Sequence, residues 1–257
     1  QALVPLPMDV TAHAFKSNAR AALADAQLQR ALTGLVSGDS LVTRRAAARE
    51  RLPEFERLRE IGRDIKNHTL AHLDLYLEAW EAKAKAAGAH VHWAPTAADA
   101  REIVLSICRD ANARIVTKGK SMISEEVGLN AHLEAAGIEV AETDLGEHII
   151  QIRGEAPSHI IAPVIHLNKE EIAEDFVRTH RGLAPDRQLA TVPDLVAEAR
   201  AVLREKFLAA DVGITGANLL IAETGSSVIV TNEGNGDLTR TLPRVHIVVA
   251  SIEKIVP

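Results

Sequence analysis

The sequence predicts an α/β fold with a mainly parallel sheet and flanking helices, preceded by an N-terminal helical arm. After Gly88, short β-type runs alternate with amphipathic segments, which is typical of βαβ units. Before Gly88, the chain is rich in Ala, Leu, Arg and Glu, and its apolar residues recur at helical spacing. We therefore expect a helical arm over residues 1–88 and an α/β domain over residues 89–257.

Within the arm, apolar residues recur at intervals of three and four, as at Leu58, Ile61 and Ile65. Gly34 interrupts this pattern, and Pro53 favours the start of a new helix, because the first helical turn does not need its N–H. The pattern predicts about three helices in the arm.

In the second part, the strands and helices are predicted from runs of β-type residues and from helical periodicity. We expect strands at 90–93, 114–117, 138–142 and 159–162, and helices at 97–110, 125–136, from the Asn168 cap through Phe176, and at 193–209. Residues 212–249 contain short strands with few helical patterns, which favours an antiparallel or mixed extension of the sheet.

The composition limits the kind of protein this is. The 257 residues are 47% hydrophobic, enough for a substantial core, and carry 29 basic and 35 acidic side chains, a net charge of -6. We expect no nucleic-acid partner and no membrane span, because there is neither an overall positive charge nor a long apolar run. The single cysteine, Cys108, favours a reducing, cytoplasmic setting. A start at Gln1 suggests a piece of a longer gene product.

A first candidate site lies at residues 117–121, where Thr-Lys-Gly-Lys-Ser follows an apolar strand and precedes a helix. Such a turn presents free backbone N–H groups, and Lys118 or Lys120 adds charge for a carboxylate or phosphate. Lys118 and Ser121 are expected to form the second wall of a site whose first wall is residues 223–240. The spacing is not that of a Walker loop. An exposed turn with solvated lysines explains the same residues.

The second candidate site is the glycine- and hydroxyl-rich stretch from Glu223 to Arg240. Glycines let the backbone approach a ligand closely, and the hydroxyl and amide groups offer hydrogen bonds, so we expect a small anionic ligand here. The expected binding residues are Thr224, Gly225, Ser226, Asn232, Gly234, Asn235 and Arg240. Glu223 and Glu233 are candidates for a general base or a covalent nucleophile. A plain hairpin would also use some of these glycines.

Other catalytic patterns are missing from the sequence. His68 and His72 are four residues apart, but the Glu of a zinc-protease motif is absent between them, and we predict no metal site. Neither a dinucleotide-binding G-x-G-x-x-G nor a hydrolase G-x-S-x-G elbow occurs. Among the histidines, His166 is the one expected to face a cleft.

Several ordered segments resemble one family. They are Lys118-Gly-Lys-Ser-Met-Ile-Ser-Glu-Glu-Val-Gly-Leu-Asn130, Glu142-Thr-Asp-Leu-Gly-Glu147, Pro157-Ser-His-Ile-Ile-Ala-Pro163, Ala222-Glu-Thr-Gly-Ser226, Thr231-Asn-Glu-Gly-Asn-Gly236, Leu242-Pro-Arg-Val-His246 and Ile252-Glu-Lys-Ile-Val-Pro257. Together they are similar to the LUD-domain family over essentially the whole chain.

The resemblance implies a fold like that of the ribose-phosphate isomerase, glucosamine-phosphate deaminase and coenzyme A transferase group. It also implies a cytoplasmic, three-subunit iron–sulfur system that oxidises L-lactate to pyruvate, in which this chain is a ligand-binding and docking domain beside the other lactate-utilisation subunits. The two [4Fe–4S] clusters would lie in a C-terminal region absent from this sequence, because Cys108 alone cannot hold them. Two alternatives stay open, namely a free-standing coenzyme A transferase-like or sugar-phosphate isomerase-like enzyme with a catalytic Glu, and a purely structural assembly module.

Overall fold

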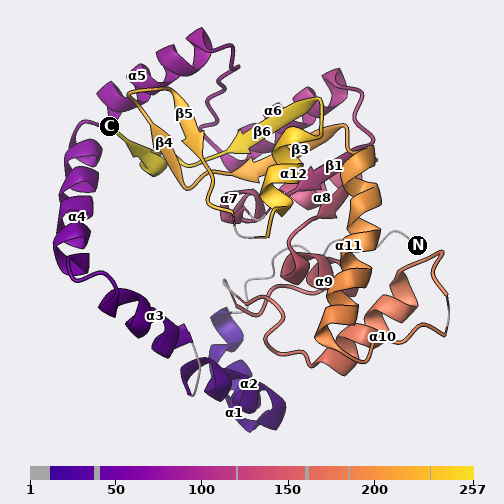
Figure 1. The fold of residues 1–257 in the computed structure, drawn as a ribbon. Helices are drawn as coiled ribbons and strands as arrows, with labels where there is room; N and C mark the ends of the chain where they lie inside the picture. The colour runs from indigo at the N-terminus through magenta and orange to yellow at the C-terminus, as the bar shows by residue number, and fades with distance from the viewer. Residues whose placement is uncertain (1–11, 38–40, 120, 160–161, 185, 232) are drawn as a thin grey trace.

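A computed structural model describes residues 12–37, 41–119, 121–159, 162–184, 186–231 and 233–257 (Figure 1). Its centre is a four-stranded parallel sheet in the order β2-β1-β3-β6. The strands are β1 (Ile115–Lys118), β2 (Glu139–Glu142), β3 (Val212–Gly216) and β6 (Val245–Val249). Val116 pairs with Val140 on one side and with Val212 on the other, and all three are buried, as expected for strands covered on both faces.

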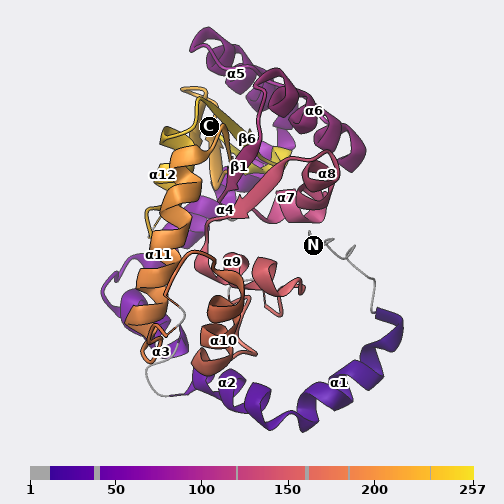
Figure 2. The same ribbon diagram turned by 90° about the vertical axis from the view of Figure 1, so that its right-hand side faces the viewer.

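Helices cover both faces of this sheet. In Figure 2, α6 (Ala97–Asp110) and α8 (Leu129–Ala135) lie on one side, and α11 (Val192–Ala209) and α12 (Asn235–Thr241) lie on the other. The main core joins Cys108 of α6, Leu133 of α8 and Ile214 of β3, each without exposed surface. This burial of apolar side chains is the dominant stabilising term of the fold.

A second cluster lies below the sheet, where Ile149, Phe176 and Leu195 pack together. They come from α9 (Leu145–Arg153), α10 (Lys169–Thr179) and α11. The short helix α7 (Met122–Glu126) follows β1. The predicted Asn168 capping box opens α10, with Asn168 and Glu171 bonded to each other's backbone N–H groups.

A small second sheet has the order β5-β4-β7, with β4 antiparallel to β5 and parallel to β7. Its strands are β4 (Leu219–Ile221), β5 (Ser226–Val228) and β7 (Ile255–Val256), and the 3-10 helix η2 (Ile252–Lys254) precedes β7. Leu220 and Ile255 are buried against Leu77 and Trp80 of helix α5 (Leu73–Ala86), so α5 packs on this sheet.

The helical arm is confirmed, but it has more breaks than the sequence predicted. Its elements are η1 (Ala12–Ala14), α1 (Phe15–Ala24), α2 (Ala26–Val36), α3 (Leu41–Glu50), α4 (Phe55–Ala71) and α5 (Leu73–Ala86). Asp25 ends α1 and caps α2 by accepting from the N–H groups of Gln27 and Leu28, and the extended φ of His72 separates α4 from α5. Such local breaks do not interrupt the apolar periodicity, so they could not be predicted from that periodicity.

Two predicted strands are wrong. Residues 90–93 pair with no described strand, because alternation alone supplies no ladder partner. His159 and Ala162 also lie outside any strand, while residues 160–161 fall outside the described part. There the chain folds back on itself, since the N–H and Oγ of Ser158 both donate to the carbonyl of Pro163 (3.0 and 2.8 Å).

The other elements are close to the predictions. The strands at 114–117 and 138–142 and the helices at 97–110 and 193–209 are confirmed to within one residue at their ends. The helix predicted over 125–136 is split at Gly128, whose φ of 67° is left-handed. Residues 212–249 are mixed as expected, with an antiparallel β4–β5 hairpin between two strands of the parallel sheet.

Candidate functional site

The order of the strands marks one position in the main sheet. The chain runs from β1 to β2 on one side and then crosses to β3 on the other side of β1. In open α/β sheets, ligands bind beyond the carboxyl ends of the strands at such a switch point. Here these ends are Lys118 of β1 and Gly216 of β3, so the predicted residues Lys118 and Ser121 lie at the expected place.

Lys118 lies inside this edge of the sheet rather than on its surface. The side chain has no exposed surface, and its Nζ lies 2.8 Å from Oε1 of Glu142 and 3.2 Å from Oγ of Ser124. Asn130 donates to the same Glu142 oxygen (2.6 Å), while the other oxygen, Oε2, has no hydrogen-bond partner among the described atoms. The buried ammonium is therefore already neutralised by a carboxylate that keeps one accepting oxygen unused.

The carboxylate of Glu142 affects the pKa of a glutamate on a neighbouring helix. Burial, followed by the nearby carboxylate of Glu142, raises the pKa of Glu134 on α8, and Lys118 acts in the opposite direction. The carboxylate of Glu142 and the ammonium of Lys118 thus act in opposite directions on the pKa of Glu134.

Hydroxyl groups complete the edge. Ser121 accepts from the N–H of Ser124 as the cap of α7, and a side chain at Gly216 would meet its Oγ at 3.2 Å. Thr143 donates to the carbonyl of Lys118 (2.9 Å) and lies 3.4 Å from Oγ1 of Thr239 on α12. We call Lys118, Ser121, Ser124, Glu142, Thr143 and Thr239 the strand-end cluster.

The first part of the stretch 223–240 packs on a helix. Gly225 has a φ of 72°, and an added Cβ would come within 2.4 Å of the N of Ala84 on α5. Trp80 of α5 donates to the carbonyl of Ser226 (3.1 Å), and Thr224 bonds to Ser226 within the turn (2.8 Å). The glycine and hydroxyls of this turn therefore make close helix packing possible.

Glu223 belongs to the same turn. Its carbonyl accepts from Nζ of Lys83 on α5 (2.7 Å), and its side chain is exposed.

The second part of the stretch lies elsewhere. Ile221 pairs with Ser226 and Leu219 with Val228, so the turn closes one end of the hairpin and the chain leaves toward α12 from the other end. The structure therefore does not bring residues 223–226 together with residues 233–240.

The residues of the second part surround the start of α12. Gly234 precedes α12 with a φ of 79°, Asn235 is its first residue, and Arg240 in its last turn pairs with Asp237 (3.3 Å). Asn232 lies outside the described residues.

Glu233 opens onto a cavity of about 350 Å³ between α9, α10 and α11. Apolar side chains such as Ile149 and Phe176 form most of its wall, and Asp144, Lys169 and Glu233 supply its charged groups. A volume of this size with few polar groups is typical of a small-molecule site.

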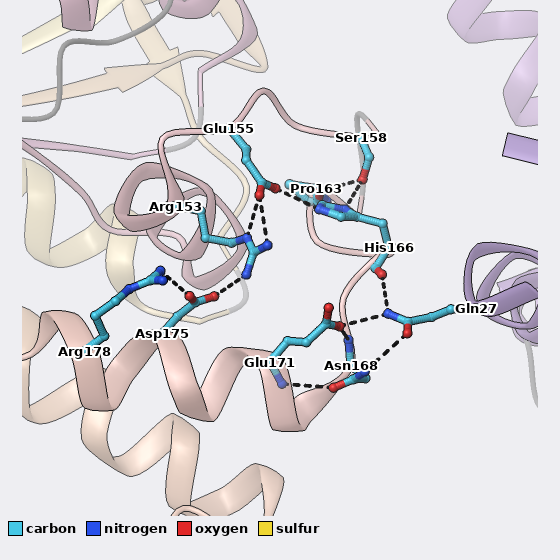
Figure 3. Close-up of polar contacts among 10 residues, drawn as sticks. All are labelled: Gln27, Arg153, Glu155, Ser158, Pro163, His166, Asn168, Glu171, Asp175 and Arg178. Atoms are coloured by element: carbon cyan, nitrogen blue, oxygen red, sulfur yellow. Dashed lines mark hydrogen bonds and ion pairs between the residues drawn. The ribbon is translucent and has the colours of Figure 1, made fainter. Parts of the chain in front are cut away.

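A network of polar contacts stabilises the loop between α9 and α10, which forms one wall of this cavity (Figure 3). His166 lies between Oε2 of Glu155 (3.0 Å) and Oγ of Ser158 (2.6 Å). Gln27 of α2 donates to the carbonyl of His166 and to Glu171 (both 2.8 Å), which ties the arm to the start of α10. The hydrogen bonds from the backbone of Asn168 and from Gln27 lower the pKa of Glu171.

The described residues do not fit a metal cluster. Within them, no group of three or more His, Cys, Asp or Glu side chains is placed to hold a metal ion. Cys108 is fully buried, and burial raises its pKa to about 11, which disfavours the thiolate that iron binds. Among the residues that the structure describes, none are therefore arranged as an iron–sulfur site.

Sequence reasoning missed Glu142, Thr143 and Lys169 as site candidates. Glu142 ends β2 and Thr143 follows it directly, and polar residues at the end of a parallel strand are a usable signal, because such ends meet at one edge. Nothing in the sequence marked Lys169, since only packing of α10 places it on the cavity.

The LUD domain profile matches residues 77–257, which include both sheets, the strand-end cluster and the cavity. The chain belongs to the LUD domain family. The match of this LUD domain chain begins inside α5, the arm helix that packs on the small sheet.

Two relatives of this LUD domain chain are named lactate utilization protein B. The chain is 42% identical over 98% of its length to lactate utilization protein B of Bacillus pumilus, and 45% identical over 88% to that of Bacillus subtilis. These alignments cover 52% and 47% of the relatives, so the chain spans about half their length. No solved structure matches it. Among the described residues, no helix has the length and apolar character needed to cross a bilayer.

Proposed function

We propose that this LUD domain chain takes part in lactate utilisation, as the ligand-binding and docking part of a system that oxidises L-lactate to pyruvate with other subunits. The observation that carries the proposal is the 45% identity over 230 residues to a protein named lactate utilization protein B. Identity at this level over so much of the chain supports a shared role.

The cavity beside Glu233 is the place we propose for a small hydroxy acid. The ammonium of Lys169 donates to the carbonyl of Ala190 (3.0 Å) and lies 3.6 Å from Oε1 of Glu170, and a third N–H is left to donate to a ligand carboxylate. Glu233 and Asp144 are acceptors for a hydroxyl group, and the apolar wall suits a methyl group. In this proposal Glu233 takes the hydroxyl proton, and the Cα–H bond breaks with its hydrogen and two electrons passing, as a hydride equivalent, to a redox group outside these residues.

The strand-end cluster has a different role in this proposal. Glu142 already neutralises Lys118, so a ligand carboxylate would gain little from that ammonium. We infer that the cluster holds the ends of β1 and β2 and the start of α9, which carries Asp144 to the cavity.

Binding measurements test the proposed cavity. L-Lactate and pyruvate titrated into the chain should bind, and Glu233→Gln and Lys169→Met should each weaken binding about tenfold or more. Glu223→Gln is the matched control, because that residue lies in the hairpin turn on α5. Equal effects of the two Glu→Gln changes would contradict the proposed cavity.

A chimera tests the proposed role itself. The matched 230 residues of the Bacillus subtilis relative would be replaced by this chain, and growth on L-lactate as sole carbon source would be measured against the unaltered relative. Restored growth is expected. A chimera that accumulates to normal levels but supports no growth would count against the role.

We further propose that iron–sulfur clusters of such a system are held by other subunits or by residues beyond these 257. The burial of Cys108, the one cysteine of the sequence, supports this proposal. Cys108→Ala should therefore leave the iron content of the assembled system unchanged, measured by metal analysis after anaerobic purification.

A further inference from the structure

Helix α4 leaves part of an apolar face uncovered. Its C-terminal half packs on the body, where Thr69 is buried and Lys66 donates to the carbonyls of Glu253 and Ile255. Its N-terminal half runs along the outer edge of the molecule in Figure 1. There Leu58, Ile61 and Ile65 remain 43%, 44% and 42% exposed.

These three side chains form one stripe with the packed half. The spacing of three and four places Leu58, Ile61 and Ile65 on the same face, and Thr69 follows Ile65 by four residues. The stripe therefore continues a face that the body already covers further along. Such a face is typical of a helix that packs on another helix.

The charged residues beside the stripe are placed to pair between two copies of α4. Arg57 and Asp64 are seven residues apart, so they lie on the same flank, two turns from each other. When two copies of α4 pack antiparallel about a two-fold axis near Ile61, Arg57 of each copy faces Asp64 of the other. Arg57 has no ion pair in the described part of the chain, and Asp64 is bonded to its neighbour Arg63 (3.1 Å).

The opposite flank allows a close approach. Gly62 lies there, and a Cβ added to it would meet no atom within 4 Å. A glycine at this position lets a second helix come near the backbone without a clash.

We propose that α4 is an interface between two copies of this chain, in which the α4 helices pair antiparallel through Leu58, Ile61 and Ile65. A self-complementary patch of this kind produces a closed two-fold dimer. One helix pair is a small interface, so the dimer dissociates at micromolar concentrations.

Analytical ultracentrifugation of the 257-residue chain over a concentration series tests the proposal. A monomer–dimer equilibrium is expected, and Ile61→Asp should abolish it. Leu208→Asp, which alters another exposed leucine on a helix (66% exposed), is the matched control and should leave it unchanged. Circular dichroism of each variant confirms folding.

Reversing the charges of Arg57 and Asp64 distinguishes a dimer interface at α4 from a dimer interface elsewhere on the chain. Arg57→Asp should weaken the dimer about tenfold, because it places two carboxylates together, and Arg57→Asp with Asp64→Arg should restore it. A chain that is monomeric throughout, or a dimer indifferent to Ile61→Asp and to charge reversal, would overturn the proposal. Binding of another protein to α4 while the chain stays monomeric would overturn it as well.

Discussion

Lys118 shows how burial changes the meaning of a residue. In the sequence it is a cation in a strand-to-helix turn, and in the structure it is an ammonium enclosed with Glu142, Ser124 and Asn130. Removing one partner of a buried pair leaves an uncompensated charge, which costs far more than the pair itself contributes.

Lys118→Met should therefore lower the free energy of unfolding by roughly 3–5 kcal/mol, because Glu142 would be left charged and buried. Urea denaturation followed by circular dichroism measures the change. The double variant Lys118→Met with Glu142→Gln should recover a large part of the loss, since no buried charge remains. A single variant as stable as the unaltered chain would show that Glu142 finds solvent or another partner.

A second buried polar group joins α9, α10 and α11. Nε2 of His148 lies 3.3 Å from Nε2 of His180, whose Nδ1 lies 2.9 Å from Glu198, and Arg187 binds the other oxygen of Glu198 (2.6 Å). Burial, followed by repulsion from His180 and Lys206, lowers the pKa of His148 to about 4 from an ordinary 6.5.

This depressed pKa makes stability depend on pH. Below pH 6.5 the unfolded chain protonates His148 while the folded chain does not, so stability falls as the pH drops toward 4, by roughly 3 kcal/mol in total. Above pH 6.5 both states are neutral and the effect vanishes. The free energy of unfolding measured from pH 4.5 to 8 should be flatter for His148→Gln. Parallel profiles of the two proteins would rule out this histidine as the cause.

Helix α2 depends on few contacts with the body. Helices α1, α2 and α3 have no buried residue among the described positions, and the hydrogen bonds described between α2 and the body all involve Gln27. Most helical stability in proteins comes from packing, so the docking of α2 should be sensitive to this one side chain.

Gln27→Ala should speed hydrogen–deuterium exchange in α2 and in residues 162–171, while β1 keeps its protection. Gln29→Ala is the matched control, since Gln29 bonds to the carbonyl of Ala22 within the arm itself (2.9 Å). If both variants exchange alike, Gln27 does not hold α2 on the body.

In the whole molecule, the parts of the arm contribute unequally to the fold. Removal of residues 1–54 takes away helices without buried residues, so the free energy of unfolding should change by about 1 kcal/mol or less. Removal of residues 1–87 also takes away Trp80 and Leu77, which cover Leu220 and Ile255. That deletion should cost roughly 3 kcal/mol or more. Urea denaturation of both deletions provides the comparison, and equal losses would contradict it.

Local signals predicted much of the α/β part. The strands at 114–117 and 138–142 are short runs of β-type residues, and the helices at 97–110 and 193–209 have strong caps and periodicity. The predicted strand at 90–93 is wrong because a strand needs a partner, which local alternation does not reveal.

The candidate site was predicted less well, again because a local pattern does not reveal which distant elements a segment contacts. Residues 223–240 are continuous in the sequence, yet the β4–β5 register sends Gly225 to α5 and Glu233 to the cavity. The binding residues stay a prediction.

The sequence by itself determined the α/β class, the helical arm and membership of the LUD domain family, because periodicity, caps and ordered motifs are local properties of the chain. Only the tertiary structure decided which polar residues meet. Lys118 and Glu142 lie on neighbouring strands, and Glu233 and Lys169 are brought to one cavity by helix packing. Contacts between distant residues follow from the packing of whole elements, which no local pattern specifies.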